Sequence, residues 1–194
     1  MLSSEIVDKK KWTYQDYVKL DDDSVRYEII EGELIMVPAP DLGHQDLSRD
    51  LEFFLWTHIK KYELGKIYYA PLDVILDEEN VVQPDLVFVS ASNQKILKSH
   101  GIEGSPDLVV EILSPSSLYR DRHQKKALYQ KFKIPEYWIV DPANQSIEVF
   151  HLENEEYRLY SFATGKGKIK SAVIDGLELD LAELFHASRS VDSG

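Results

Sequence analysis

The sequence predicts an α/β fold in which helices flank a mixed β-sheet. Between Asp46 and about Tyr62, apolar residues recur at helical spacing, which predicts a helix with one face packed on a sheet. Four apolar runs have the residue types of strands: YYAPLDVIL, QPDLVFV, DLVVEIL and YWIVD. A helix expected from about Leu118 to Lys133 separates the last two runs and is long enough to connect parallel strands. This combination of strands and helices predicts the fold class.

Two shorter elements precede the first long helix. Thr13 and Asp16 have the spacing of a helix start, so a short helix is expected over residues 14–20. The run YEIIEGELIMV predicts two strands around Gly32, the arrangement of a β-hairpin. Gly65 is expected to end the long helix that follows.

The chain changes character beyond Pro142, where strand pairs replace the alternation of strands and helices. The runs IEVFHL and YRLYSF predict an additional C-terminal β-hairpin with its turn at Asn154, and LELDLAELF is expected to close the fold. Nothing in the punctuation suggests two domains, so we expect one domain over residues 1–194 with a core from about 11 to 185. The two ends, SSEIVDKKK and ASRSVDSG, are expected to fray.

Composition excludes several classes of protein and of site. The chain has 194 residues, 43% of them hydrophobic, which is enough for one substantial core. Its apolar runs are short and its N-terminus lacks the core of a signal peptide, so we expect a cytoplasmic protein without a membrane span. There is no cysteine, which excludes disulfides, thiolate zinc sites and cysteine nucleophiles.

The charge balance is acidic. Lysine and arginine number 22 against 34 aspartates and glutamates, giving a formal net charge of −12. This is the wrong sign for a protein that binds nucleic acid mainly by charge. The only dense basic cluster near the candidate site described below is at positions 120, 122, 125 and 126, and a DNA channel would have to use it.

Two carboxylates stand in or beside apolar runs. Glu111 shares one face of its predicted strand with Val109 and Leu113, and the other face is apolar as well, so this is expected to be a central strand. A buried carboxylate without a partner is costly, so a cation must hold Glu111. Asp85 follows a proline at the start of another run, where a ligand could reach it, although Pro-Asp is also a common turn dipeptide.

A lysine is the expected partner. At about 100° per residue, Lys125 lies at the centre of the apolar stripe of its helix and is expected to point inward, whereas Lys126 lies on the flank. The preceding strand offers Glu111 as the carboxylate that an inward ammonium needs. The alternative is that Lys125 extends its ammonium to solvent.

Together these groups predict a hydrolytic metal site. Asp85 and Glu111 would supply the hard oxygen ligands that Mg²⁺ prefers, with Mn²⁺ as a substitute. A metal-bound water could attack a phosphodiester, and the Lys125 ammonium would assist it. The structural alternative is that Glu111 and Lys125 form a buried ion pair without catalytic role.

Other residues are weaker candidates. Glu28, in RYEIIEGE, could join the site or pair with a nearby cation as an ordinary strand residue. His44, expected just before the first long helix, could contact a phosphate or a substrate base, or be an ordinary helix-cap or surface histidine. Tyr129 is expected in the core, and the serines of SPSS are expected to cap the helix that follows.

These motifs resemble the Uma family of restriction-endonuclease-like proteins. The resemblance rests on RYEIIEGELIMVPAP, GHQ, QPDLVFV and DLVVEILSPSS with RDRHQKKALYQKFKIPEYWIVDP, and covers residues from about 11 to 185. The family is placed in the PD-(D/E)XK nuclease superfamily. The resemblance therefore implies a restriction-endonuclease-like mixed sheet flanked by helices, and a Mg²⁺-dependent phosphodiesterase site.

The resemblance also assigns positions. It makes Asp85 the aspartate of the PD motif and Glu111 the acidic residue of the second motif. The sequence departs from the superfamily formula at Leu113, where a lysine is expected. In the Uma pattern the lysine lies on the next helix, which here matches Lys125, between an aspartate and a tyrosine at positions 121 and 129.

Glu28 and His44 match further positions of the family pattern. The leading hypothesis is therefore a Mg²⁺-dependent nuclease that hydrolyses phosphodiester bonds of DNA. The alternatives are an inactive nuclease-fold module for binding or assembly, and a hydrolase of a small phosphodiester. An exposed strand among the C-terminal hairpins could support a homodimer.

Overall fold

Two six-stranded β-sheets form the framework of the computed structural model, which describes residues 11–20 and 25–187. Sheet A has the strand order β2-β1-β5-β4-β8-β7, and sheet B has the order β12-β11-β10-β9-β6-β3. The strands of sheet A are β1 (Arg26–Ile30), β2 (Glu33–Val37), β4 (Val74–Asp77), β5 (Asn80–Val82), β7 (Leu97–Lys98) and β8 (Gly101–Glu103). Those of sheet B are β3 (Gly65–Tyr69), β6 (Leu86–Ser90), β9 (Leu108–Ile112), β10 (Glu136–Asp141), β11 (Ser146–Glu153) and β12 (Glu156–Thr164). The ends that the sequence predicts to fray fall almost entirely outside the described residues.

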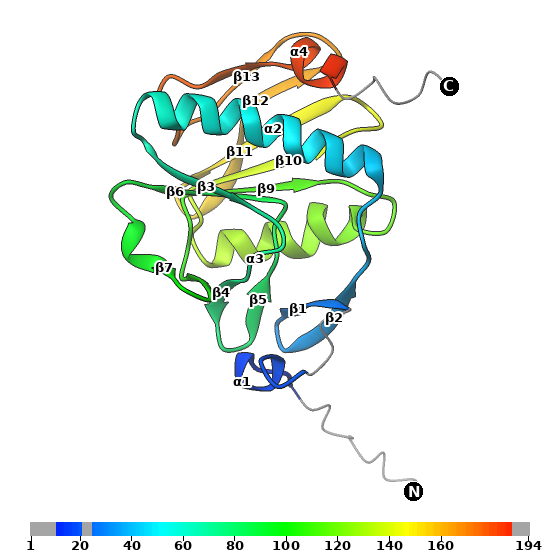
Figure 1. Cartoon of the computed structure of the whole chain (residues 1–194), viewed down its shortest axis with the longest axis vertical. Helices are drawn as coiled ribbons and strands as arrows, with labels where there is room; N and C mark the ends of the chain where they lie inside the picture. The colour runs from blue at the N-terminus through cyan, green and yellow to red at the C-terminus, as the bar shows by residue number, and fades with distance from the viewer. Residues whose placement is uncertain (1–10, 21–24, 188–194) are drawn as a thin grey trace, which may run out of the picture.

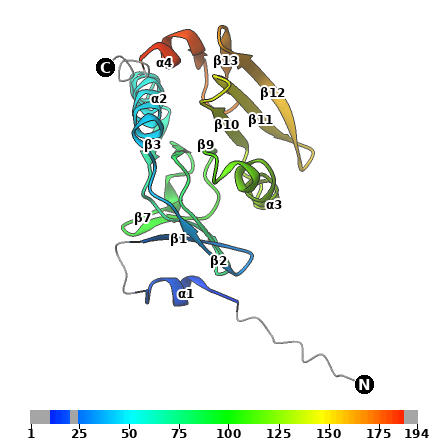
Figure 2. The same ribbon diagram turned by 90° about the vertical axis from the view of Figure 1, so that its right-hand side faces the viewer.

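The helical segments of the described residues are α1 (Tyr14–Tyr17), α2 (Leu42–Lys61), the 3₁₀-helix η1 (Gln94–Ile96), the π-helix η2 (Arg120–Lys125), α3 (Lys126–Lys131) and α4 (Leu181–Ala187). A small third sheet pairs β13 (Lys168–Lys170) with β14 (Glu178–Asp180). Figure 1 shows α2 and α4 on one side of sheet B and α3 on the other, with sheet A beyond α3 and α1 at the far end. Figure 2 shows the same layers after a quarter turn. The expected α/β fold with helices on a mixed sheet is confirmed, with a second large sheet in addition.

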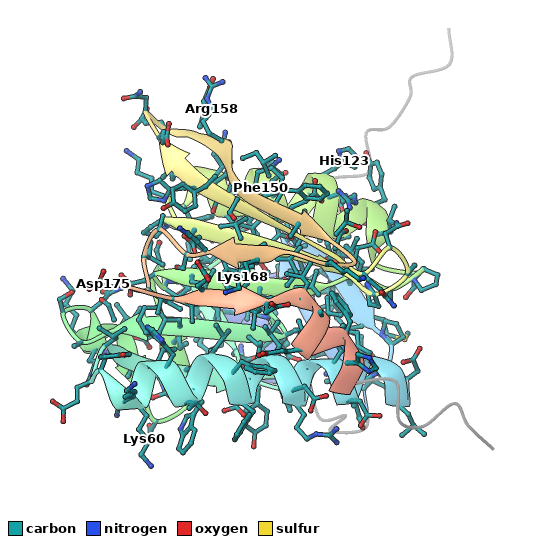
Figure 3. The ribbon with its side chains drawn as sticks, turned by 90° about the horizontal axis from the view of Figure 1, so that it is seen from above. Lys60, His123, Phe150, Arg158, Lys168 and Asp175 are labelled. Atoms are coloured by element: carbon teal, nitrogen blue, oxygen red, sulfur yellow. The ribbon has the colours of Figure 1, made fainter. Side chains whose placement is uncertain are left out.

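Helix α2 follows from its sequence pattern. Leu47, Leu51, Leu55 and Ile59 are buried against sheet B, as their spacing predicts. The helix begins at Leu42, earlier than expected, because Asp41 accepts a hydrogen bond from the backbone N–H of His44 (2.8 Å) and caps it. Figure 3 shows Lys60, near the other end of α2, pointing away from the sheet.

The chain beyond α2 corrects two expectations. The helix ends before Gly65, which instead begins β3, where an added Cβ would collide with the carbonyl oxygen of Val89. The run YYAPLDVIL is not one strand: it divides between β3 in sheet B and β4 in sheet A. Pro71 stands at the break, because a proline has no N–H for a β-ladder.

Strand β9 is central, as expected. It runs parallel to β10 and antiparallel to β6, and the helix after β9 makes the crossover. Its alternation is also as expected: Val109 packs on the side of α3, whereas Leu108 and Val110 pack on the side of α2. Glu111 therefore points toward the helix that follows its own strand.

That helix departs from the regular geometry assumed for it. It spans residues 118–131 instead of 118–133, and residues 120–125 are π-helical. Lys125 is buried, as predicted, and Lys126 is half-buried on the flank. A π-helical turn hydrogen-bonds each residue to the fifth along the chain, so it alters which side chains share a face.

Both predicted hairpins are present. Residues 31 and 32 join β1 to β2 with positive φ angles of 52° and 79°. Asn154 and Glu155 do the same between β11 and β12, with φ of 49° and 68°. Figure 3 shows Arg158 projecting at the outer end of this second hairpin. LELDLAELF contributes a short strand and then a helix, because Asp180 accepts a hydrogen bond from the backbone N–H of Ala182 (2.9 Å).

The structure also bears on the question of a membrane span. Among residues 11–20 and 25–187, no helix combines the length and the apolar character that crossing a membrane requires.

Candidate active site

A cavity of about 880 Å³ lies between α2, the end of β9 and the helical segment after it. Its lining includes the five residues that the sequence singled out: Glu28, His44, Asp85, Glu111 and Lys125. They come from five segments, namely β1, α2, the turn before β6, β9 and η2. Figure 1 shows the first turn of α2 and the β1–β2 hairpin on the same side of the molecule. The structure thus gathers the whole predicted set around one space.

Asp85 is fixed through one of its two carboxylate oxygens. Its Oδ2 accepts a hydrogen bond from the backbone N–H of Ile112 (2.7 Å) and lies 3.3 Å from Nε2 of His44. Both contacts use Oδ2, so Oδ1 remains available to a ligand. The cap at Asp41 places His44 in the first turn of α2, where its ring reaches both Asp85 and the backbone of Ile112.

Glu111 is fixed in the same way. Its Oε1 accepts hydrogen bonds from Nζ of Lys125 (2.8 Å) and from the hydroxyl of Tyr129 (2.6 Å). Tyr129 is fully buried, as expected of a core residue, and it also orients this carboxylate. Both donors use Oε1, which leaves Oε2 available on the cavity side.

Glu28 shares the lysine. Its Oε1 lies 2.7 Å from Nζ of Lys125 and accepts a hydrogen bond from the backbone N–H of Gln83 (2.8 Å). Its Oε2 is buried and has no hydrogen-bond partner, and NH1 of Arg120 lies 4.0 Å from it. One ammonium therefore joins the carboxylates of β1 and β9.

Burial and crowding set the protonation of this cluster. Burial raises the pKa of Glu111 well above its usual range, and the carboxylates of Asp121, Asp85 and Glu28 raise it further against the opposing charge of Lys125. Burial alone would lower the pKa of Lys125, but Glu111, Glu28 and Asp121 together raise it above its ordinary value. Lys125 is therefore a firmly protonated ammonium at neutral pH.

Two neighbours are shifted as well. Burial raises the pKa of Asp121, although Lys125 and a hydrogen bond from Ser117 oppose the change. Burial lowers the pKa of the His44 imidazole, but the hydrogen bond and charge of Asp85 and a backbone hydrogen bond at Ile112 outweigh it. The net effect is a His44 pKa above its ordinary value.

The donor set suits a hydrated divalent cation better than a closed metal cage. Within the described ranges 11–20 and 25–187, no group of three or more His, Cys, Asp or Glu side chains is placed to hold a metal ion. Asp85 and Glu111 offer two carboxylates, and Mg²⁺ is commonly bound by one or two carboxylates with waters and substrate phosphates completing the shell. The cavity lining carries six carboxyl groups against four arginine and lysine side chains. The carboxyl groups are those of Glu28, Asp41, Glu52, Asp85, Glu111 and Asp121, and the cations are Arg26, Arg49, Arg120 and Lys125. This local excess of negative charge favours a bound cation.

The predicted basic cluster divides in two. Arg120 and Lys125 line the cavity, whereas Arg122 bonds to Glu148 (2.6 Å) and Nζ of Lys126 lies 3.4 Å from the centre of the Phe150 ring. Of the four positions that a DNA channel would have to use, two therefore line the cavity and two have partners elsewhere. The serines of SPSS behave as expected: Ser114 and Ser117 each accept a hydrogen bond from the other's backbone N–H, as in a capping box.

Sequence reasoning missed three contributors to the site. Arg120 entered only as part of a basic cluster, because regular α-helical geometry places it away from Lys125. Asp121 lies near Lys125 on the helical wheel and matches the family pattern, but it was not singled out as a site residue. The backbone of Gln83, which binds Glu28, carries no sequence signal, since any residue except proline offers an N–H there.

Two comparisons describe proteins similar to this chain. An uncharacterised protein from Synechocystis sp. is 25% identical over 134 residues, covering 66% of this chain and 74% of its own length. A crystal structure described as "a putative nuclease belonging to DUF820" from Anabaena variabilis has the same fold, with a TM-score of 0.75 and 19% sequence identity. That similarity covers 91% of this chain and 98% of the other.

A family model covers most of the chain. The model named Uma2 and described as "Putative restriction endonuclease" matches residues 14–182, a span that contains all five candidate residues. The resemblance drawn from the motifs is thereby confirmed, and the chain belongs to the Uma2 family of restriction-endonuclease-like proteins.

Proposed function

We propose that the protein is a metal-dependent nuclease that hydrolyses phosphodiester bonds of DNA, with Asp85 and Glu111 as ligands of Mg²⁺ or Mn²⁺. One observation carries the proposal. Each of these carboxylates is anchored through one oxygen and has its second oxygen available, and both line the same acidic cavity. Ligands oriented in this way hold a cation without a large loss of side-chain entropy on binding.

The chain's own residues orient the reacting groups. When bound, the cation would supply an activated water and neutralise charge on the phosphate. Ile112 and His44 hold Asp85, while Lys125 and Tyr129 hold Glu111. The imidazole of His44 also faces the cavity, where it could donate to a phosphate oxygen.

Lys125 acts as an ammonium and not as a base. Its raised pKa keeps it protonated at neutral pH, so it cannot accept the proton of the attacking water. Two of its N–H groups are directed at Glu28 and Glu111. The third is available to stabilise negative charge that develops on the phosphate during attack.

Cavity size favours a second candidate, the hydrolysis of a small phosphodiester. A volume of about 880 Å³ is that of a small-molecule site, and the net charge of −12 opposes long-range attraction of DNA. The same catalytic groups would serve either substrate. The two candidate substrates differ only in the groups attached to the scissile phosphate, which are DNA strands in one and small substituents in the other.

The decisive variant is Glu111→Gln. It keeps the side-chain shape but removes a metal ligand, so we expect loss of Mn²⁺-dependent cleavage while circular dichroism remains that of the wild type. Cleavage is measured on single-stranded and duplex oligonucleotides and on a small aryl phosphodiester. At Mn²⁺ concentrations about 100-fold above Kd, the wild type should gain about 2.7 kcal/mol of stability. That corresponds to roughly 5–11 °C in Tm for a chain of this size.

Glu136→Gln is the matched control. Glu136 is as buried as Glu111 but lies outside the cavity, where it accepts hydrogen bonds from Trp138 and Ser171. The control should retain both cleavage and the Mn²⁺ shift. If Mn²⁺ changes the Tm of neither the wild type nor Glu111→Gln, and neither protein cleaves any of the substrates, the proposal is refuted. The chain is then a binding or assembly module with a structural Glu111–Lys125 pair.

A further inference from the structure

Arg120 is a cavity-lining cation with incomplete partners. Its side chain is only 17% exposed, yet within the described residues its guanidinium has an ion pair at 4.0 Å, to Oε2 of Glu28, and no hydrogen bond. A guanidinium carries five N–H donors in a fixed plane, and those of Arg120 are not fully buried, so they are accessible from the cavity. Such a group is placed to meet an acceptor that comes from outside the chain.

The facing carboxylate oxygen is equally incomplete. Glu28 is almost fully buried, and its Oε2 has no hydrogen-bond partner. The distance of 4.0 Å to Arg120 exceeds the 2.7–3.2 Å range of N–H···O hydrogen bonds. Arg120 and Glu28 therefore form an ion pair without a hydrogen bond. Arg120 can leave this position without breaking a hydrogen bond.

The π-helix puts Arg120 in this position. In a regular α-helix, residues five apart point about 140° away from each other, so Arg120 and Lys125 would lie on nearly opposite sides. In a π-helix, residues five apart stack, and here both cations approach Glu28, Lys125 at Oε1 and Arg120 at Oε2. The unusual helix brings a second cation to the cavity.

The other cationic side chains that line the cavity have partners of their own. Lys125 binds two carboxylates at 2.7 and 2.8 Å. Arg26 donates to the carbonyl oxygen of Pro38 (3.1 Å), and Arg49 pairs with Asp46 (2.9 Å) on the same helix. Arg120 is the one among these four whose donors await an acceptor.

We propose that Arg120 is a phosphate-binding residue of this site, taking two non-bridging oxygens of a phosphate group in a bidentate contact. The inference rests on the proposed function, because it assumes that the cavity receives a phosphodiester. Arginine matches this role through its planar pair of donors. In the absence of substrate, Glu28 keeps the guanidinium at the cavity wall.

The test compares Arg120→Gln with Arg122→Gln. Arg122 lies on the same π-helix but bonds to Glu148 outside the cavity, so it is the matched control. The probe is inorganic phosphate, titrated into metal-free protein and followed by phosphorus NMR. Arg120→Gln should weaken phosphate binding roughly 10- to 150-fold, the loss expected for charged hydrogen bonds, and Arg122→Gln should leave it unchanged.

Two further measurements separate a phosphate contact from a structural role. The KM for a phosphodiester substrate should rise in Arg120→Gln, while its Mn²⁺-induced thermal shift stays that of the wild type. Arg120→Lys retains the charge but not the planar pair of N–H donors. Its phosphate affinity should therefore lie between those of the wild type and Arg120→Gln. Should Arg120→Gln not fold, Arg120→Lys decides: an unchanged phosphate affinity in that variant overturns the proposal.

These experiments distinguish failure of the Arg120 proposal from failure of the proposed nuclease function. If Glu111→Gln abolishes cleavage but Arg120→Gln binds phosphate as the wild type does, the nuclease survives and the role of Arg120 is refuted. If phosphate binding depends on Arg120 but no phosphodiester is cleaved, the binding site stands and the nuclease does not. Equal weakening by Arg120→Gln and Arg122→Gln would reveal a general charge effect and overturn the assignment.

Discussion

Replacing Lys125 by methionine removes the charge that holds the site together. In the wild type its ammonium lies 2.7 Å from Glu28 Oε1 and 2.8 Å from Glu111 Oε1, with only 4% of the residue exposed. Methionine fills similar space without charge, so Lys125→Met leaves two buried carboxylates without their shared cation. Breaking a buried ion pair in this way costs roughly 3–5 kcal/mol of unfolding free energy. For a chain of this size, we expect Tm to fall by roughly 6–20 °C.

The loss should depend on pH in a definite direction. Burial already raises the pKa of Glu111, and loss of the Lys125 charge, which opposes that rise, raises it further, so the folded state binds more protons. The unfolding free energy of Lys125→Met then falls as pH rises from the unfolded pKa of a glutamate toward the raised folded pKa of Glu111. The deficit relative to wild type is therefore largest at neutral pH and shrinks toward pH 4–5, as urea unfolding at several pH values would measure.

Lys126→Met is the matched control on the adjacent residue. Its ammonium lies over the Phe150 ring and is half-buried, so the variant should lose about 1 kcal/mol at every pH. The double variant Lys125→Met/Glu111→Gln should recover part of the loss, because only Glu28 remains uncompensated. Equal destabilisation by the two lysine variants, or a Lys125→Met deficit that is constant with pH, would refute the ion-pair reasoning.

Two further predictions concern the cavity rim. The pKa of His44 is raised by Asp85 in the folded state, so its contribution to stability is complete below about pH 6.5 and is lost as pH rises through the folded value. In metal-free protein, His44→Gln should therefore reduce the difference in unfolding free energy between pH 6 and pH 8, and an unchanged difference would contradict the pairing. The ring of Tyr69 lines the cavity and is 64% exposed, so it can stack on a nucleobase. Tyr69→Ala should raise KM for a single-stranded oligonucleotide roughly 5- to 150-fold but not for a phosphodiester without a base; equal effects on both would exclude stacking.

The sequence predicted the centre of the site because simple periodicities govern it. Strand alternation indicates that Glu111 is buried, and the helical wheel indicates that Lys125 points inward; the structure places their atoms 2.8 Å apart. Glu28 and His44 depended more on the family pattern, because a single carboxylate or imidazole in a strand or near a helix end has many ordinary explanations. Four of the five residues lie on helices or strands, and Asp85 lies in the turn directly before β6.

What the sequence could not predict depends on geometry between or within elements. The division of YYAPLDVIL into two sheets is set by Pro71, but a proline alone does not say that the chain moves to another sheet. The π-helix is a greater obstacle, because a wheel drawn at regular pitch places Arg120 far from Lys125. The residue that the structure adds to the site is thus the one whose position depends on the local departure from α-helical geometry.

The distribution of charge reconciles an acidic protein with a phosphodiester substrate. Exposed charges more than about 10 Å apart are largely screened at moderate salt, so the net charge of −12 matters less than the groups within the cavity. The nearby cations Arg122 and Lys126 are engaged by Glu148 and Phe150. Under the proposed function, a phosphate would be contacted by Arg120, His44, Lys125 and a bound cation, fewer groups than the 6–10 phosphate contacts that give strong salt dependence. A substrate that inserts one phosphodiester into the cavity, as a single strand, a chain end or a small diester does, satisfies this arrangement better than a duplex lying across the surface.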